Sequence, residues 1–145
     1  MMERSETTQI TDDFVRTYQA LGKDNLSILA DLYHQNVVFE DPAHRVEGIE
    51  QLTQYFARLF QSVTHCEFQI HETITEGQVA YVQWTMLFSH PKIAKGQQRQ
   101  VNGCSRLAFS DGKVIGHRDY FDMGEMIYEG VPLMGPIVRH IKASL

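Results

Sequence analysis

The chain has 145 residues, of which 43% are hydrophobic and 21% charged, and its formal net charge is -5 at pH 7. This composition is typical of one globular domain spanning residues 1–145, and it excludes disordered, fibrous and membrane classes. The Lys and Arg residues are scattered, whereas a nucleic-acid surface needs clustered cations. No apolar run approaches the length of a bilayer. We therefore expect neither nucleic acid nor a membrane among the partners.

The beginning of the chain, residues 1–6, carries charges with no apolar stretch behind them. Neither a secretory signal nor a transit peptide is visible there, so the expected location is the cytoplasm. Cys66 and Cys104 lie inside strand-like runs without CxxC spacing, which favours two free buried thiols over a disulfide or a redox pair.

The first half of the chain shows helical periodicity. A first helix is indicated by apolar residues at helical spacing that end before Gly22, namely Ile10, Phe14, Val15, Tyr18 and Leu21. A second, shorter helix is indicated by Leu26, Leu29, Ala30 and Tyr33. The clearest amphipathic pattern belongs to a third helix and comprises Ile49, Leu52, Tyr55, Phe56, Leu59, Phe60 and Val63.

Between the second and third helices, residues 36–41 are predicted to form a strand that ends in a carboxylate. Val37 and Phe39 share a face with Asp41, because side chains alternate along a strand. Pro42 then forces Asp41 into an extended backbone and stops the strand. A strand-ending turn would need no further function, so the interest of Asp41 depends on its neighbours.

After residue 65 the apolar period changes from 3.6 to 2. Strands are predicted at about 66–75, 79–90, 99–110 and 113–123, with turn residues at Glu76-Gly77, at 91–96 and at Asp111-Gly112. Helices followed by a meander of antiparallel strands form an α+β domain, with the helices on one face of the sheet. The tail from 132 to 145 is predicted to form a last short helix, and its Met-rich approach either caps a pocket or packs on the sheet edge.

Alternation also predicts which side chains face the helices. In the strands this covered face carries mostly apolar residues, namely Ala80, Val82, Trp84, Met86, Phe88, Gly103, Leu107, Phe109, Ile115 and Phe121. The same face also holds Ser105, His117 and Asp119. Buried carboxylates cost several kcal/mol unless they are paired, so a face with polar groups of this kind indicates a pocket.

The alternatives to a catalytic pocket remain open at this point. His117 and Asp119 can pair with each other, or with an Arg at a dimer surface, without doing chemistry. There is no HExxH, GxSxG or phosphate-binding glycine loop, and the seven His residues are dispersed. We therefore expect neither a metal site nor a cofactor. An apolar pocket with few polar groups is typical of a small-molecule site.

The residues from Phe14 to Asp122 resemble the SnoaL-like and ketosteroid isomerase-like superfamily. The resemblance is carried by Leu32-Tyr33, Val38-Phe39-Glu40-Asp41-Pro42, Gly48-Ile49, Tyr55-Phe56, and the run from Ser110 to Asp122. It implies a cone-shaped fold, in which a curved, mainly antiparallel sheet wraps around three N-terminal helices. It also implies a homodimer formed through the outer face of the sheet, which carries Tyr81, Gln83, Asn102, Arg106 and Arg118.

The resemblance implies roles for single residues. Asp41 falls where ketosteroid isomerases keep the Asp that shuttles a proton, and Tyr18 falls where they keep the oxyanion-hole Tyr. Their second donor, a protonated Asp, aligns with Ser105. The general-base Asp of limonene epoxide hydrolases and the catalytic Asp of SnoaL-like cyclases fall at or near Asp119, beside His117. The Arg and second Asp of the hydrolases fall on Trp84 and Met86, so that triad is absent.

The sequence thus predicts an isomerase or cyclase that acts by Asp acid-base catalysis on a small apolar carbonyl compound such as a steroid or polyketide. Asp41, Tyr18, Asp119 and His117 are the predicted catalytic residues. The predicted ligand-binding residues are Phe14, Phe39, Phe56, Trp84, Met86, Phe88, Ser105 and Phe121. The rivals are a protein that binds a hydrophobic ligand without catalysis, an epoxide hydrolase-like enzyme, and an interaction domain.

Overall fold

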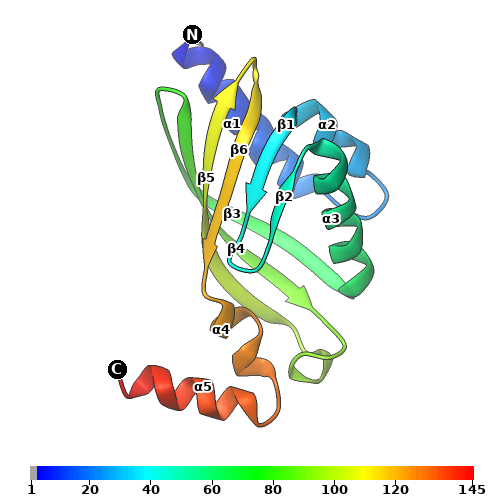
Figure 1. Cartoon of the computed structure of the whole chain (residues 1–145), viewed down its shortest axis with the longest axis vertical. Coiled ribbons are helices and arrows are strands. Elements are labelled where there is room, and N and C mark those ends of the chain that lie inside the picture. The colour runs from blue at the N-terminus through cyan, green and yellow to red at the C-terminus, as the bar shows by residue number, and fades with distance from the viewer. Residues whose placement is uncertain (1–2) are drawn as a thin grey trace.

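The computed structural model of the protein describes residues 3–145, in which helices come first and a long sheet follows (Figure 1). Helix α1 (Arg4–Ala20) begins with a capping box, in which the backbone N–H of Glu3 donates to the Glu6 carboxylate. Ile10, Phe14 and Tyr18 are buried at helical spacing, so one stripe of α1 faces the rest of the protein. The predicted first helix is confirmed.

The sheet has the strand order β2-β1-β6-β5-β4-β3 within the described residues, and it curves without closing on itself (Figure 1). Its strands are β1 (Tyr33–Glu40), β2 (Arg45–Glu47), β3 (His65–Glu76), β4 (Val79–Ser89), β5 (Arg99–Ser110) and β6 (Lys113–Phe121). All neighbouring strands are antiparallel except β1 and β6, which are parallel. The predicted α+β class with a mainly antiparallel sheet is confirmed.

The remaining N-terminal helices are short α2 (Leu29–Leu32), which follows the 3-10 turn η1 (Leu26–Ile28), and α3 (Ile49–Ser62). Helix α1 packs along β3, and α3 packs beside β1. Leu52 and Phe56 are the buried residues of α3, one turn apart on the face that points inward. The predicted third helix is confirmed within one residue at its end.

Strand alternation determines the interior of the sheet as predicted in β4 and β5. Ala80, Val82, Trp84, Met86 and Phe88 are each at most 5% exposed. The side chains on the opposite face are more exposed, apart from Thr85. The predicted inner row of β5 is also buried from residue 105 onward. These rows form the floor beneath the helices.

The prediction for Ile115 is wrong, because β6 contains an irregularity. The pairing register shifts between Ala108 and Phe109, so that Phe109 pairs with Val114. Val114 is fully buried, whereas Ile115 is half-buried. An extra residue on one strand inverts the alternation locally, and strict alternation from the sequence does not anticipate it. His117 is nevertheless buried on the inner face, as predicted.

Two boundaries also differ from the sequence prediction. Tyr33 is the first residue of β1 and not part of the second helix, and β1 therefore begins three residues before the predicted strand at 36. The loop at 42–48 contains the short edge strand β2, which pairs with the end of β1. Both differences arise because pairing between distant segments extends strands beyond their local preference.

The chain ends in a C-terminal arm, formed by α4 (Met123–Met126), η3 (Tyr128–Gly130) and α5 (Met134–Ala143). Figure 1 shows this arm below the sheet, with α5 standing apart from it. Lys142 Nζ donates to Asp122 Oδ2 at 2.5 Å and to Glu129 at 3.1 Å, which ties the last helix to the beginning of the arm. The predicted tail helix is confirmed. No helix among residues 3–145 is long and apolar enough to cross a membrane.

Candidate active site

Asp41 follows β1 directly and is only 7% exposed. The backbone N–H groups of Ala43 and His44 donate to its Oδ1 at 2.8 and 2.7 Å. Its own N–H donates to the carbonyl oxygen of His44, which closes the turn after Pro42. An Asp side chain that binds the backbone two and three residues ahead is held in one orientation. The turn therefore fixes where the carboxylate points.

Tyr55 is the second group of this site. Its hydroxyl donates a hydrogen bond of 2.6 Å to Asp41 Oδ2, and the His44 ring nitrogen Nδ1 lies 3.2 Å from Oδ1. Burial raises the pKa of the Tyr55 hydroxyl well above its usual range, and the neighbouring Asp41 carboxylate raises it further. Tyr55 therefore keeps its proton at neutral pH and acts as a donor.

Sequence reasoning did not identify Tyr55 as a site residue. Its position on the inner side of an amphipathic helix is the usual signature of a core aromatic, and it lies 14 residues from Asp41 in the sequence. The available signal was the hydroxyl, since a buried Tyr normally needs a partner for its O–H group. Phe39 packs against the Tyr55 ring with a centroid distance of 5.1 Å, which helps to hold the ring in place.

Asp41 and Tyr55 line a pocket of about 370 Å³, which we call the Asp41 pocket. This volume lies near the lower end of the range of about 300 to 1,000 Å³ for ligand pockets. The apolar lining comes from the helices, the sheet and the C-terminal arm, and comprises Ala43, Leu59, Val63, Met86, Phe88, Ile93, Phe121, Met123, Met126 and Ile127. The other polar lining residues are His44, Arg58, Ser62 and His90.

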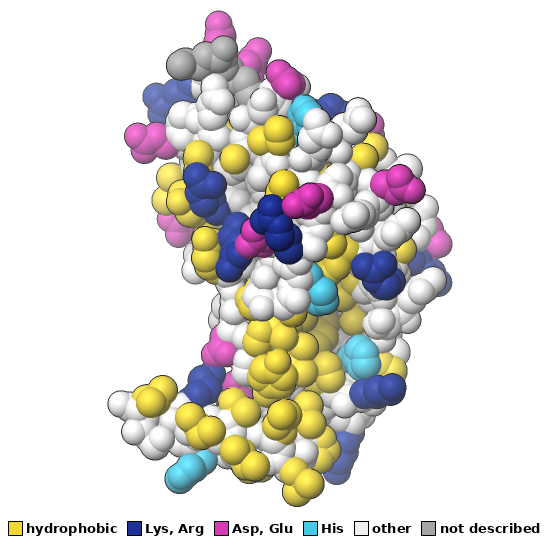
Figure 2. Space-filling model, viewed as in Figure 1, with side chains coloured by type: hydrophobic (Ala, Val, Ile, Leu, Met, Phe, Trp, Pro, Cys, Tyr) yellow, Lys and Arg dark blue, Asp and Glu magenta, His cyan; other side chains and the backbone are white. Residues whose placement is uncertain are grey.

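Figure 2 shows hydrophobic side chains gathered over the lower half of one face, next to the C-terminal arm, with His and basic side chains beside them.

Of the predicted site residues, Asp41, Met86, Phe88 and Phe121 line the Asp41 pocket. The C-terminal arm supplies Met123, Met126 and Ile127 to the same wall. Flexible Met side chains suit a wall that adapts to different ligand shapes.

Several predicted ligand-binding residues do not line this pocket. Phe14, Phe39 and Phe56 are buried in the core between helices and sheet, each at most 3% exposed. Trp84 and Ser105 are buried as well, and the Trp84 indole Nε1–H donates to Ser105 Oγ at 2.9 Å. These residues fill the interior between the helices and the sheet, a question that the sequence had left open.

The other predicted catalytic residues form a separate cluster of hydrogen bonds. We call it the interior polar chain, and its members are Tyr18, Tyr33, His117, Asp119, Ser105 and Trp84. Tyr18 and Tyr33 hydroxyls lie 2.6 Å apart, and Tyr33 lies 2.7 Å from His117 Nδ1. His117 Nε2 is 2.6 Å from Asp119 Oδ1, which also accepts from Ser105 at 2.5 Å.

The donors and acceptors available on each side chain determine the direction of each hydrogen bond in the interior polar chain. The indole of Trp84 can only donate, so the Ser105 oxygen accepts and the Ser105 hydroxyl donates to Asp119. His117 then donates from Nε2 to Asp119, which leaves Nδ1 to accept from Tyr33. Tyr33 in turn accepts from Tyr18. A neutral imidazole satisfies the whole chain, so these donors converge on the Asp119 carboxylate.

Asp119 is the more open end of this chain, with a side chain that is 16% exposed. Burial raises the pKa of the Tyr18 and Tyr33 hydroxyls well above their usual range, and the Asp119 charge raises both further. Both phenols therefore remain protonated. The sequence had predicted that Tyr18 and Asp41 face the same guest molecule. In the structure the Tyr18 hydroxyl belongs to the interior polar chain, and the phenol that contacts Asp41 is Tyr55.

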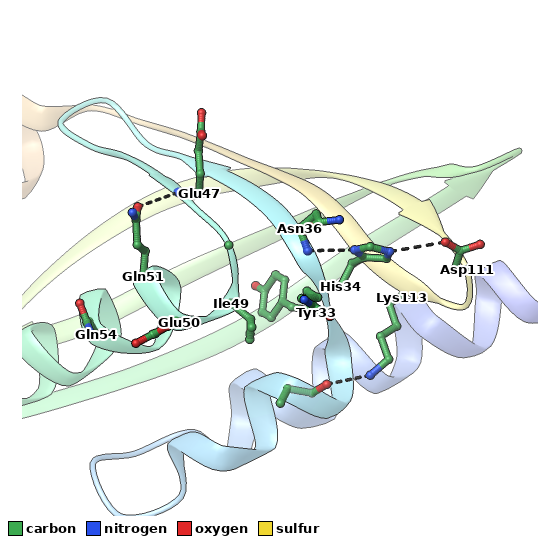
Figure 3. Close-up of a pocket in the computed structure, with 13 residues that line it drawn as sticks. Tyr33, His34, Asn36, Glu47, Ile49, Glu50, Gln51, Gln54, Asp111 and Lys113 are labelled. Carbon is green, nitrogen blue, oxygen red and sulfur yellow. Dashed lines mark hydrogen bonds and ion pairs between the residues drawn. The ribbon is translucent and has the colours of Figure 1, made fainter.

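A second hollow, of about 1,030 Å³, lies at the other end of β1 (Figure 3). It is lined largely by polar residues of β1, β2, the beginning of α3 and the turn before β6. His34 lies 3.4 Å from Asp111, and Lys113 Nζ donates to the Ala30 carbonyl oxygen at 2.7 Å. This hollow shares no lining residue with the Asp41 pocket. Its volume is larger, but it contains none of the predicted catalytic carboxylates.

The donor set does not indicate a metal site. Among residues 3–145, no group of three or more His, Cys, Asp or Glu side chains is placed to hold a metal ion. Asp41 and Asp119 each accept hydrogen bonds from N–H or O–H groups of the protein, and within the described residues they have no hydrogen-bond partner in common.

A family model for the SnoaL-like domain matches residues 14–117. This range includes Asp41, Tyr55 and every member of the interior polar chain except Asp119. The chain belongs to the SnoaL-like family. A search of curated proteins gave no match. The SnoaL-like fold thus agrees with the superfamily that the sequence resembles.

Solved structures show the same fold at low sequence identity. A putative SnoaL-like polyketide cyclase from Jannaschia sp. CCS1 is 20% identical, with a TM-score of 0.72, covering 85% of this chain and 92% of that one. An LEH-like epoxide hydrolase from M. tuberculosis is 19% identical, with a TM-score of 0.68, covering 95% of this chain and 97% of that one. A hypothetical protein with a ketosteroid isomerase-like fold from Catenulispora acidiphila DSM 44928, solved with trimethylamine, is 14% identical, with a TM-score of 0.74, covering 88% and 95%.

Proposed function

We propose that this SnoaL-like protein binds a small, mainly apolar carbonyl compound in the Asp41 pocket and moves a proton on it, as an isomerase or cyclase does. The observation that carries the proposal is the Asp41 carboxylate, which is 7% exposed and lies in the wall of an otherwise largely apolar pocket. A fixed carboxylate in such a setting is suited to general acid-base catalysis.

The geometry leaves Asp41 able to accept a proton. Oδ1 accepts from two backbone N–H groups, whereas Tyr55 is the closest donor to Oδ2. Each carboxylate oxygen has two lone pairs. Tyr55 occupies one on Oδ2, and His44 Nδ1 lies closer to Oδ1, at 3.2 Å, than to Oδ2, at 3.4 Å, so the second Oδ2 lone pair is left for a substrate proton. The C–H bond next to the carbonyl breaks, its electron pair moves onto the carbonyl oxygen as an enolate, and the proton moves to Asp41. Returning the proton to another carbon completes an isomerisation.

Tyr55 has the role of enolate donor in this proposal, in place of Tyr18. It lines the pocket and keeps its proton, because its pKa is raised by burial and by Asp41. When Asp41 takes up the substrate proton, the Tyr55 hydroxyl is free to turn toward the developing negative charge. General acid-base catalysis typically accelerates a reaction by about 10² to 10⁴-fold. One hydrogen-bond donor to the developing oxyanion lowers the activation free energy by roughly 3 kcal/mol.

Exchange of carbon-bound hydrogen tests this proposal without knowledge of the natural substrate. A panel of cyclic and aryl ketones is incubated with the protein in D₂O, and deuterium uptake next to the carbonyl is followed by NMR. We expect Asp41→Asn to lower the exchange rate of any accepted ketone by about 10² to 10⁴-fold. Asp119→Asn, which alters the interior polar chain, distinguishes the two predicted bases. Unchanged exchange in both variants would refute the proposal.

A non-catalytic binding protein is the second candidate, and one observation favours it. Tyr18, the predicted oxyanion donor, is 6% exposed and is hydrogen-bonded to Tyr33 in the interior polar chain. Under this reading, ketones that bind in the pocket would show no deuterium uptake above the rate in buffer. An epoxide hydrolase-like reaction would use Asp119 instead, and it would survive Asp41→Asn.

We also propose the homodimer that the resemblance implies. On the outer sheet face, the residues Tyr81 and Tyr120 are 46% and 54% exposed, and the Arg118 guanidinium lies 5.2 Å from the Tyr120 ring centre. Exposed aromatic and Arg side chains are enriched in protein interfaces. Sedimentation at micromolar concentration tests the proposal, and Tyr120→Lys is expected to shift a dimer to monomer. We also propose a cytoplasmic location, which fractionation of the source cells would test.

A further inference from the structure

Arg58 is the one guanidinium among the residues that line the Asp41 pocket. It is exposed, it lies on α3 one turn after Tyr55, and it has no ion-pair partner within residues 3–145. Arg45 and Arg118, by comparison, both pair with Glu40. The charge of Arg58 is therefore available to a ligand at the pocket.

His90 supplies a second donor to the same pocket from a different element, the segment after β4. The backbone N–H of Lys92 donates to His90 Nδ1 at 3.0 Å. Because Nδ1 accepts, the proton of the neutral imidazole is on Nε2. Nε2 has no partner among the described residues, so this N–H group is also free to bind a ligand.

The Asp41 carboxylate, in contrast, already has hydrogen-bond donors. Oδ1 accepts from the backbone N–H groups of the turn, and Oδ2 accepts from Tyr55 and keeps one lone pair for the substrate proton. The Ser62 hydroxyl donates its proton to the carbonyl oxygen of Arg58 within α3, so it is not a free donor. The His44 ring faces the Asp41 carboxylate. The lining thus offers unpaired donors at Arg58 and His90, and a ligand that pairs with both of them must bring acceptor atoms.

We infer that the pocket selects apolar molecules that carry a carboxylate group, which Arg58 binds with support from His90. The inference rests on the proposed function, whose substrate it narrows to an oxo acid. An Arg guanidinium matches a carboxylate with two parallel hydrogen bonds, whereas it has no such match in a neutral apolar compound. The apolar walls then take the rest of the molecule.

The spacing on α3 limits the shape of this oxo acid. Tyr55 and Arg58 are three residues apart on one helix, so they face the same side at a separation of about 5 to 6 Å between Cβ atoms. Tyr55 and Asp41 define the place of the reacting carbonyl group. A carboxylate a few carbon atoms from that carbonyl, as in a 4-oxo acid, is compatible with this spacing.

A matched pair of probes tests the inference by calorimetry. The probes are 4-oxo-4-phenylbutanoate and its neutral amide, 4-oxo-4-phenylbutanamide, which have nearly the same shape. We expect the acid to bind at least about tenfold more tightly than the amide, and Arg58→Gln to remove that preference while changing the amide affinity by less than about twofold. Lys92→Gln is the control, because it removes an equal charge close to His90 from a side chain that does not line the pocket.

Three results would overturn the inference: no detectable binding of the acid at millimolar concentration, equal binding of acid and amide, or an equal loss in Arg58→Gln and Lys92→Gln. The last result would indicate general attraction by positive charge and not a contact. Asp41→Asn separates this test from the proposed function. That variant is expected to lose deuterium exchange and to keep its preference for the acid. If Asp41→Asn loses deuterium exchange and still prefers the acid, both the proposed catalysis and the carboxylate selection are supported. If the wild-type protein prefers the acid but shows no exchange, only the proposed catalysis is refuted.

Discussion

The Tyr55 hydroxyl donates to Asp41 Oδ2 at 2.6 Å, whereas the sequence had predicted that the phenol of Tyr18 reaches the same guest molecule as Asp41. Tyr55→Phe removes this donor and leaves the two backbone bonds to Oδ1 intact. We expect the variant to lose about 1 to 3 kcal/mol of unfolding free energy, the usual range for removing one partner of a buried hydrogen bond to a charged group. Urea denaturation measures the loss. An unchanged midpoint would show that the bond contributes nothing to stability.

Tyr33 is expected to couple energetically to Tyr18, because it accepts from Tyr18 and donates to His117 in the interior polar chain. Tyr33→Phe leaves the buried Tyr18 hydroxyl and His117 Nδ1 without partners, at a cost of about 1 to 3 kcal/mol for each unpaired group. The double variant Tyr18→Phe with Tyr33→Phe removes one of these unpaired groups. Its total loss should therefore be smaller than the sum of the single losses. Simple additivity in urea denaturation would contradict the hydrogen-bonded chain.

Gly103 is expected to be irreplaceable because the Trp84 ring lies against it. A Cβ atom at this position would lie 2.3 Å from Trp84 Cη2, far inside van der Waals contact. Gly103→Ala should displace the indole, break its bond to Ser105 and cost about 1 to 3 kcal/mol or more. Trp84 is the only Trp in the chain, so its fluorescence reports the displacement directly.

Gly22→Ala is the control for this substitution. The nearest atom to a Cβ there is 3.9 Å away, so the added methyl group meets no clash. We expect this variant to keep the wild-type fluorescence spectrum and a stability within about 1 kcal/mol of the wild type. If both alanine variants behaved alike, contact with Trp84 would not explain the result.

We expect ionisation of the Cys66 thiol to lower the stability of the protein at alkaline pH. It is a half-buried free thiol that packs against the core, and burial raises its pKa to about 12. The unfolded chain ionises this thiol near pH 8.5, whereas the folded protein resists ionisation, so its contribution to stability is complete below that pH. The contribution is then lost as the pH rises from about 8.5 toward 12. Urea denaturation at several pH values should show a shallower decline in Cys66→Ala.

Helix and strand types followed from the sequence, because burial of one face imposes a period that can be read locally. The stripe in α3 and the alternation in β4 each predicted an element and its buried side. Asp41 was likewise identified correctly as a buried carboxylate, since Val37, Phe39 and Pro42 fix its face and its backbone. Its role in catalysis stays a prediction.

Local sequence patterns did not predict those features of the fold that depend on pairing between distant segments. The edge strand β2 exists because β1 offers it free hydrogen-bonding groups, and the bulge in β6 moves Val114 to the buried side in place of Ile115. The C-terminal arm lines the Asp41 pocket through Met123 and Met126. From the sequence, the tail could either cap a pocket or pack on the sheet edge.

The sequence by itself determined the α+β class, the family and a buried row with acidic and imidazole side chains, since periodicity and local backbone restrictions are properties of neighbouring residues. Only the tertiary structure decided which partner each polar group has. Asp41 meets Tyr55, whereas Tyr18, Tyr33, His117 and Asp119 satisfy one another in a separate chain. A hydrogen bond depends on a distance of about 3 Å between groups that can be far apart along the chain, and no local pattern encodes that distance.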